Sequence, residues 1–149
     1  MSSVTVFVDT SVLILSEDGA RPDAREQVLA WLRRLWQQRS GRVSTQVLND
    51  FYRLVTTRIS PAMPNGDARA EVRRYQRWSP WQIDHATVES AWSIESRFGL
   101  AYADALIVAA AKAQGCALLL SLELPHGQVY DSVQVLDPLR AAPEPLLEK

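Results

Sequence analysis

The segment Val4-Thr5-Val6-Phe7-Val8-Asp9-Thr10-Ser11 decides how the rest of the sequence is interpreted. Its first five residues are β-branched or aromatic and, apart from Thr5, apolar, which predicts a buried strand. The strand runs directly into Asp9, and open α/β sheets bind ligands at the carboxyl ends of their parallel strands. Asp9 is therefore a candidate site residue. The alternative is that Asp9, Thr10 or Ser11 caps the following helix.

A second apolar strand, predicted over residues 116–120, repeats this arrangement near the other end of the chain. Ser121 and Glu123 follow it, so a hydroxyl and a carboxylate again come after a strand. If the two strands are neighbours in a parallel sheet, Asp9 and Glu123 share one edge of that sheet. The alternative for Glu123 is an ordinary exposed loop acid.

Two further carboxylates lie on the apolar faces of predicted helices. Asp50 falls inside the apolar stripe of a helix predicted over residues 45–59, so its side chain is expected to point towards the core side of the helix. The alternative interpretation is that Asp50 lies at the edge of the stripe and its side chain bends to solvent. Asp104 lies in the first turn of a helix predicted over residues 100–114, on the face that packs against the sheet. The helix dipole also favours an acid in a first turn, which is a purely structural reason for Asp104.

The order of elements predicts an α/β protein. Apolar periodicity and turn residues indicate further helices and short strands between these segments: a short helix at 12–15, helices beginning at 21 and over 67–78 and 84–97, and strands at 42–44, 81–83 and 133–136. Strands that alternate with helices predict a three-layer α/β/α fold around a central, mainly parallel sheet of about five strands. We expect one domain over residues 1–140 and a flexible Pro-rich tail over residues 141–149.

Composition narrows the class of protein. The 149 residues are 47% hydrophobic and 22% charged, which fits one soluble domain. Cys116 is the only cysteine, so no internal disulfide can form, and no cluster of Cys and His offers zinc ligands. The sequence shows no basic leader with a long apolar run, and we expect a cytoplasmic protein.

The charge distribution bears on nucleic-acid binding. A net charge of -1 argues against a general polyanion binder. Fourteen of the sixteen basic residues are Arg, whose planar guanidinium binds phosphate or carboxylate through two parallel hydrogen bonds. Arg69, Arg73 and Arg77 recur every four residues, which predicts one basic helix face that either binds phosphate or is simply solvated.

Four carboxylates in one cleft would raise one another's pKa values unless a cation were bound between them. Oxygen ligands without Cys or His favour Mg²⁺ or Mn²⁺ over Zn²⁺. Such an ion lowers the pKa of its bound water and neutralises charge on a phosphodiester. The acidic pattern therefore predicts metal-dependent phosphate chemistry.

Three segments, Phe7–Leu13, Ser44–Tyr52 and Ala103–Ala111, resemble the successive motifs of PIN-domain ribonucleases, specifically of VapC-like toxins. The resemblance covers nearly the whole chain. It implies an α/β/α fold, a Mg²⁺- or Mn²⁺-dependent endoribonuclease that cleaves RNA, a homodimer, and control by a small cognate antitoxin. The family's first and third acids fall on Asp9 and Asp104, which we expect to bind the metal directly.

Two regions depart from the family pattern. The second acid is usually Glu, and this chain has the shorter Asp50. After the corresponding strand the family usually has a hydroxyl residue, an acid, Asp and Leu, whereas this chain has Ser121-Leu122-Glu123-Leu124, so Leu122 replaces one acid and Glu123 replaces the Asp. We expect Asp50 and Glu123 to complete the catalytic set, with the longer Glu123 offsetting the shorter Asp50. Three hydroxyl residues are expected to support the acids: Thr10, Ser11 and Ser121.

Other interpretations remain open at the level of sequence. His126-Gly127 matches a His-Gly pair of the family, and we expect His126 to shape its loop, because activation of a metal-bound water needs no histidine. A phosphatase of the haloacid-dehalogenase type also has an Asp after its first strand, but its second acid would fall on Ser11. A PIN-fold binding module with weak or no catalysis is a further alternative, suggested by the two departures. If RNA is the substrate, the Arg69, Arg73 and Arg77 face is the candidate RNA-binding surface.

Overall fold

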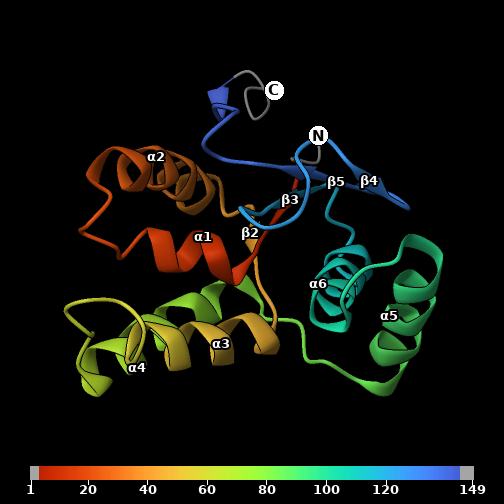
Figure 1. Cartoon of the computed structure of the whole chain (residues 1–149), viewed down its shortest axis with the longest axis horizontal. Coiled ribbons are helices and arrows are strands. Elements are labelled where there is room, and N and C mark those ends of the chain that lie inside the picture. Colours follow the sequence, from red (N-terminus) through yellow and green to blue (C-terminus); the bar gives the residue numbers. More distant parts are fainter. Residues whose placement is uncertain (1–3, 145–149) are drawn as a thin grey trace.

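Five strands form one central sheet in a computed structural model that describes residues 4–144 (Figure 1). The strands are β1 (Val6–Val8), β2 (Gly41–Arg42), β3 (Leu118–Leu120), β4 (Val129–Tyr130) and β5 (Val133–Leu136). Their order across the sheet is β2-β1-β3-β5-β4. The β1 strand is parallel to both β2 and β3, β3 is parallel to β5, and only β4 is antiparallel to its neighbour. The predicted mainly parallel sheet is confirmed.

The helices complete a three-layer α/β/α fold. They are α1 (Thr10–Leu15), α2 (Pro22–Gln38), α3 (Thr45–Val55), α4 (Asn65–Arg74), α5 (His85–Phe98) and α6 (Tyr102–Ala113), with a 3₁₀ helix η1 (Tyr75–Trp78) after α4. Helix α6 packs against β3 and β5, and α5 packs on α6. Helix α1 contacts both α2 and α3. Figure 1 shows α1 to α4 on the left and α5 and α6 on the right.

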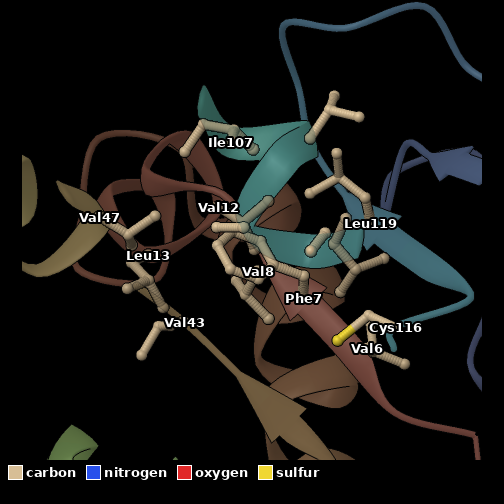
Figure 2. Packing of buried hydrophobic residues seen from close by; sticks show 14 of the residues in the cluster. Val6, Phe7, Val8, Val12, Leu13, Val43, Val47, Ile107, Cys116 and Leu119 are labelled. Carbon is tan, nitrogen blue, oxygen red and sulfur yellow. The ribbon is translucent and has the colours of Figure 1, made fainter. Parts of the chain in front are cut away.

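Strand β1 lies at the centre of the hydrophobic core. Val6, Phe7 and Val8 are fully buried. Figure 2 shows them packed with side chains from α1, α6 and β3, among them Leu13 and Leu119. Full burial of an aliphatic or aromatic side chain stabilises the folded state by about 1.5–3 kcal/mol. The strand that precedes Asp9 is therefore held rigidly by its apolar side chains.

The sheet order explains why the ends of β1 and β3 form a site. From β1 the chain passes to β2 on one side and later to β3 on the other, and ligands of open α/β sheets bind where the order reverses in this way. Val8 is paired with Leu120 in the parallel ladder. The next residues of the two strands, Asp9 and Ser121, therefore emerge side by side.

Local signals fixed several boundaries as predicted. Asp84 is the N-cap of α5, and its carboxylate accepts a 2.9 Å hydrogen bond from the Thr87 backbone N–H. Gly99 ends α5 in the left-handed conformation with φ 67°, which glycine adopts without steric cost.

Among the helices of residues 4–144, none combines the length and apolar character needed to cross a membrane.

One predicted strand is wrong and one was missed. Residues 81–83 form no strand, and Trp81 makes only an isolated parallel bridge to Ser44. The missed strand is β4, which lies at the edge of the sheet and pairs with β5 across a short turn at Asp131. Its two residues are too few to show the period-two alternation on which strand prediction depends.

Two predicted helices are shorter than expected. Helix α3 ends at Val55, because the Thr56 hydroxyl donates to the Tyr52 carbonyl at 2.8 Å and so competes with the helical backbone. The helix predicted over residues 67–78 is α4 followed by η1. The tighter 3₁₀ turn places residues three apart on one side, and it buries both Tyr75 and Trp78.

The start of the predicted tail packs against α2. Trp31 Nε1 donates a 2.7 Å hydrogen bond to the Ala141 carbonyl, and Pro143 is buried. The remainder of the predicted tail, residues 145–149, lies outside the described residues.

Candidate active site

Asp9 and Ser121 join the ends of β1 and β3. Ser121 Oγ donates a 2.8 Å hydrogen bond to Asp9 Oδ2, and the Thr10 backbone N–H donates to Asp9 Oδ1 at 2.7 Å. Asp9 is also the N-cap of α1. The cap and the site interpretations of Asp9 are therefore compatible, because one carboxylate oxygen faces the helix and the other faces the neighbouring strand end.

The serine hydroxyls fix the two strand ends to each other. Ser121 Oγ also accepts hydrogen bonds from the backbone N–H groups of Glu123 and Leu124, both at 3.1 Å. Ser11 Oγ accepts a 3.2 Å hydrogen bond from the Leu122 N–H. Ser121 is fully buried. The two serines therefore set the path of the chain after β3, and with it the position of Glu123.

All four predicted carboxylates line one cleft of about 400 Å³. They come from four separate elements: the end of β1, helix α3, the first turn of α6 and the segment after β3. The lining residues are Asp9, Thr10, Ser11, Ile14, Leu15, Asp18, Arg21, Gln46, Asp50, Leu54, Ala103, Asp104, Ile107, Leu122 and Glu123. The structure thus brings together positions as far apart in sequence as 9 and 123.

Asp9 is the most strongly perturbed acid in the cleft. Only 6% of its surface is exposed, and this burial raises its pKa from 3.8 to about 6. The charges of Asp104 and Glu123 raise the pKa of Asp9 further, while the hydrogen bonds from Ser121 and Thr10 lower it. Partial burial also raises the pKa of Asp104. A cation in the cleft would stabilise the ionised form of both acids.

Asp50 and Glu123 are more exposed to solvent than Asp9. The Asp50 side chain is 39% exposed and lies 3.5 Å from the Arg53 guanidinium, in an ion pair one helical turn along α3. Glu123 is exposed. Both acids are departures from the family pattern, and both lie at the margin of the cleft.

Gln46 is a lining residue that sequence reasoning missed. Its Nε2 donates a 3.0 Å hydrogen bond to the Ala103 carbonyl, which joins α3 to the residue before Asp104. Its Oε1 is buried and has no partner among the described residues. Gln46 lies one turn before Asp50, so its place on the same helix face was the available signal. Asp18 and Arg21 also line the cleft and gave no such signal.

The donor atoms of the cleft suit a hard divalent cation. They are carboxylate, hydroxyl and amide oxygens, with no Cys or His among the lining residues. Within residues 4–144 no three Asp, Glu, His or Cys side chains lie close enough together to hold a metal ion jointly. Mg²⁺ needs only one or two direct carboxylate ligands because it keeps several of its waters. The residues present therefore fit an ion held by one or two acids, with the others acting through water.

The predicted arginine face lies outside this cleft. Arg69 stacks over the Tyr52 ring, with 5.9 Å between the guanidinium carbon and the ring centroid. Arg77 belongs to η1 and lines a separate cavity with Trp36 and Trp78. The three arginines are exposed but do not share one α-helical face, because the helix tightens before Arg77.

His126 has the loop-shaping contact expected of it. Its Nδ1 accepts a 2.9 Å hydrogen bond from the Asp137 backbone N–H, which ties the loop after β3 to the end of β5. His126 does not line the cleft.

Comparison with known proteins identifies the family. The model of the PIN domain family matches residues 6–123, which contain all four carboxylates, and the chain belongs to the PIN domain family. No curated protein matches the sequence at a significant level.

Three solved structures share the fold at low sequence identity. VapC20 of Mycobacterium tuberculosis, a sarcin-ricin loop cleaving toxin, is 21% identical with a TM-score of 0.59, over 77% of this chain and 87% of VapC20. FitAB bound to a DNA fragment is 20% identical with a TM-score of 0.61, over 90% and 95%. VapBC2 of Rickettsia felis bound to promoter DNA is 11% identical with a TM-score of 0.61, over 89% and 97%. The fold is thus that of VapC-like PIN domains.

Proposed function

We propose that this chain is a metal-dependent endoribonuclease that acts as a VapC-like toxin. The observation that carries the proposal is the convergence of Asp9, Asp50, Asp104 and Glu123 on one cleft at the strand-order reversal. Membership of the PIN domain family supports nuclease chemistry. The fold shared with VapC20, a toxin that cleaves the sarcin-ricin loop, supports RNA as the substrate class.

Each residue of the cleft has a proposed part in this chemistry. Asp9 and Asp104 would hold Mg²⁺ or Mn²⁺ directly, and Asp50 and Glu123 would hold its waters. When bound, such an ion supplies activation of water near neutral pH and neutralisation of charge on the phosphodiester. Ser121 orients the Asp9 carboxylate through the 2.8 Å hydrogen bond. Ser11 and Ser121 keep the segment that carries Glu123 against the strand ends.

We also propose a small antitoxin as a protein partner, a homodimer as the assembly and the cytoplasm as the location. FitAB and VapBC2 are complexes of toxin and antitoxin bound to DNA fragments, and this chain shares their fold. An acidic cleft that must stay inactive in the producing cell is a natural target for such an inhibitor. Co-purification of the chain with the product of an adjacent short reading frame would test this partner.

The nuclease assignment is tested by Asp104→Asn. This substitution removes a charge from the cleft but keeps the size of the side chain, so we expect loss of RNA cleavage with the fold intact. Asp67→Asn is the matched control, because Asp67 is exposed in the first turn of α4 and does not line the cleft. Cleavage of total cellular RNA would be followed with Mg²⁺ and with Mn²⁺. Undiminished cleavage by Asp104→Asn would overturn the assignment.

A second candidate is a PIN-fold binding module without catalysis. The observations that favour it are the exposed Glu123, the Asp50–Arg53 ion pair and the lack of a preformed three-residue metal cluster within residues 4–144. Calorimetric titration with Mn²⁺ separates the two candidates. Heat of binding that is lost in Asp9→Asn supports the nuclease, whereas no binding at millimolar Mn²⁺ supports the binding module.

A further inference from the structure

Arg21 is the single basic residue among the described residues that line the acidic cleft. The same lining carries five carboxylates, which are Asp9, Asp18, Asp50, Asp104 and Glu123. A strand of RNA brings one negative charge per nucleotide, so its phosphates are repelled by this lining wherever no cation faces them. Among the described lining residues, Arg21 is therefore the side chain that attracts an approaching phosphate.

The guanidinium of Arg21 is not used within the described part of the chain. Between residues 4 and 144 no carboxylate lies within ion-pair distance of it. Asp18, the acid three residues before it, accepts a 3.0 Å hydrogen bond from the Ala20 backbone N–H instead. Arg21 is exposed. Its five N–H donors are thus available to a ligand in the cleft.

The backbone that carries Arg21 is fixed on both sides. Arg25 Nε donates a 2.9 Å hydrogen bond to the Ser16 carbonyl, which ties the first turns of α2 to the end of α1. The Arg25 backbone N–H donates to the Arg21 carbonyl at 2.8 Å, so Arg21 is held as the N-cap of α2. Pro22 follows and restricts the backbone further. Only the side chain of Arg21 remains to be ordered when a ligand binds.

We propose that Arg21 is a positioning residue that binds a backbone phosphate of the RNA substrate on the α1–α2 side of the cleft. This inference rests on the proposed nuclease function and adds a substrate contact to it. A guanidinium can bind two phosphate oxygens at once, so it fixes the direction of the strand as well as its distance. Such a contact would hold the strand at the cleft that Asp9 and Asp104 also line. The proposal also assigns RNA binding to the rim of the cleft, rather than to the Arg69, Arg73 and Arg77 segment predicted from the sequence.

The test is RNA binding by Arg21→Ala in an Asp104→Asn background, in which the RNA stays uncut. The probe is a fluorescein-labelled single-stranded RNA of mixed sequence, titrated at several salt concentrations with Mg²⁺ held constant. We expect roughly five- to tenfold weaker binding, and a salt dependence of log Kd that is shallower by about 0.7, the loss of one phosphate contact on a single strand. Arg21→Lys should keep the slope and restore part of the affinity.

Arg58→Ala is the matched control, because Arg58 is exposed, follows α3 and does not line the cleft. It removes the same net charge, so a purely long-range electrostatic effect would weaken RNA binding equally in both variants. Equal affinities and slopes for Arg21→Ala and Arg58→Ala overturn the Arg21 contact while leaving the nuclease proposal intact. Failure of both the Asp104→Asn parent and the wild type in chelator to bind RNA overturns both proposals. Urea unfolding of each variant shows that the fold is retained.

Discussion

Ser121 donates a hydrogen bond of 2.8 Å to Asp9, although 112 positions separate them in the sequence. The bond joins the ends of two adjacent parallel strands at the point where the strand order reverses. Ser121 also accepts two backbone hydrogen bonds from the segment that carries Glu123. One buried hydroxyl therefore orients one acid directly and positions a second through the backbone.

Replacing this hydroxyl should cost stability. In Ser121→Ala, one Asp9 oxygen loses its donor, and the buried Leu124 N–H and the part-buried Glu123 N–H lose their acceptor. Each unsatisfied buried group costs about 1–3 kcal/mol. We expect a total loss of about 2–4 kcal/mol in the free energy of urea unfolding. Ser93→Ala is the control, because Ser93 accepts only an exposed bond from Arg97. A Ser121→Ala protein as stable as Ser93→Ala would show that the hydroxyl does not hold the strand ends.

Asp9→Asn should stabilise the metal-free protein at neutral pH while removing activity. Burial raises the pKa of Asp9 to about 6 in the folded state, against 3.8 without burial. The folded state therefore binds this proton more tightly, and ionisation of Asp9 destabilises the fold progressively as pH rises from about 4 to about 6. The difference in unfolding free energy between Asp9→Asn and wild type should grow over that range to about 2–3 kcal/mol.

Urea titrations in chelator at a series of pH values would measure this difference. Below about pH 4 both proteins carry a neutral side chain at position 9, so their pH profiles should run parallel there. A difference that stays constant from acid to neutral pH would contradict the raised pKa. Addition of Mn²⁺ should stabilise the wild type more than Asp9→Asn, because bound metal raises the apparent stability of the form that binds it.

The four carboxylates could be predicted from the sequence because each has a local signature. Asp9 and Glu123 follow apolar strands, and Asp50 and Asp104 interrupt apolar helix faces. Parallel pairing of strands with a helix between them then requires their ends to meet at one edge. Local pattern and general topology were sufficient to bring these acids together in one cleft.

Gln46 and Arg21 could not be predicted in the same way. Gln46 shares a helix face with Asp50, but its contact with Ala103, 57 residues away, is encoded by no local pattern. Arg21 lines the cleft because the turn after α1 brings the start of α2 back beside it. Conversely, Arg69, Arg73 and Arg77 showed a clear helical period, but burial of Tyr75 and Trp78 tightened the chain and separated them. A periodic pattern identifies the residues on one helix face, but only tertiary contacts determine which part of the protein or solvent that face contacts.

Asp131 should stabilise the edge of the sheet through ion pairs. It accepts hydrogen bonds from Arg97 at 2.7 and 2.8 Å and from Lys112 at 3.0 Å, which tie the β4–β5 turn to α5 and α6. These bonds hold the pKa of Asp131 well below its usual range. Their contribution is therefore present above about pH 4 and is lost as the pH falls below the unfolded pKa. Asp131→Asn should lower the thermal midpoint at pH 7, and this effect should shrink progressively as the pH falls below about 4.

The matched control for Asp131→Asn is Glu26→Gln, which breaks a single exposed ion pair with Arg33. Exposed pairs of this kind contribute between about 0 and 1 kcal/mol. High salt should reduce the difference between wild type and Asp131→Asn, because screening weakens pairs on the surface. An equal effect of the two substitutions at pH 7 would show that the pairs of Asp131 add nothing beyond an ordinary surface pair.

Gly41 should not tolerate any side chain, because Trp78 lies directly on it. A Cβ at position 41 would lie 2.7 Å from three atoms of the Trp78 indole. That indole is 2% exposed and is held between Trp36 and Tyr75, with ring centroids 4.8 and 4.9 Å away. These ring contacts restrict its movement away from position 41, so we expect Gly41→Ala to lower the unfolding free energy by about 1–3 kcal/mol.

Gly66→Ala is the control, because a Cβ there meets no atom within 4 Å and the residue lies in helix α4. Alanine in a helix is favoured over glycine by about 0.5–1 kcal/mol, so this variant should be as stable as wild type or more so. Shrinking the indole in Trp78→Leu should make Gly41→Ala less costly in the double variant, because the overlap is then removed. Additive losses in that cycle, or equal stability of Gly41→Ala and Gly66→Ala, would show that the indole does not restrict position 41. Additive losses in particular would assign the destabilisation of Gly41→Ala to a cause other than steric overlap with Trp78.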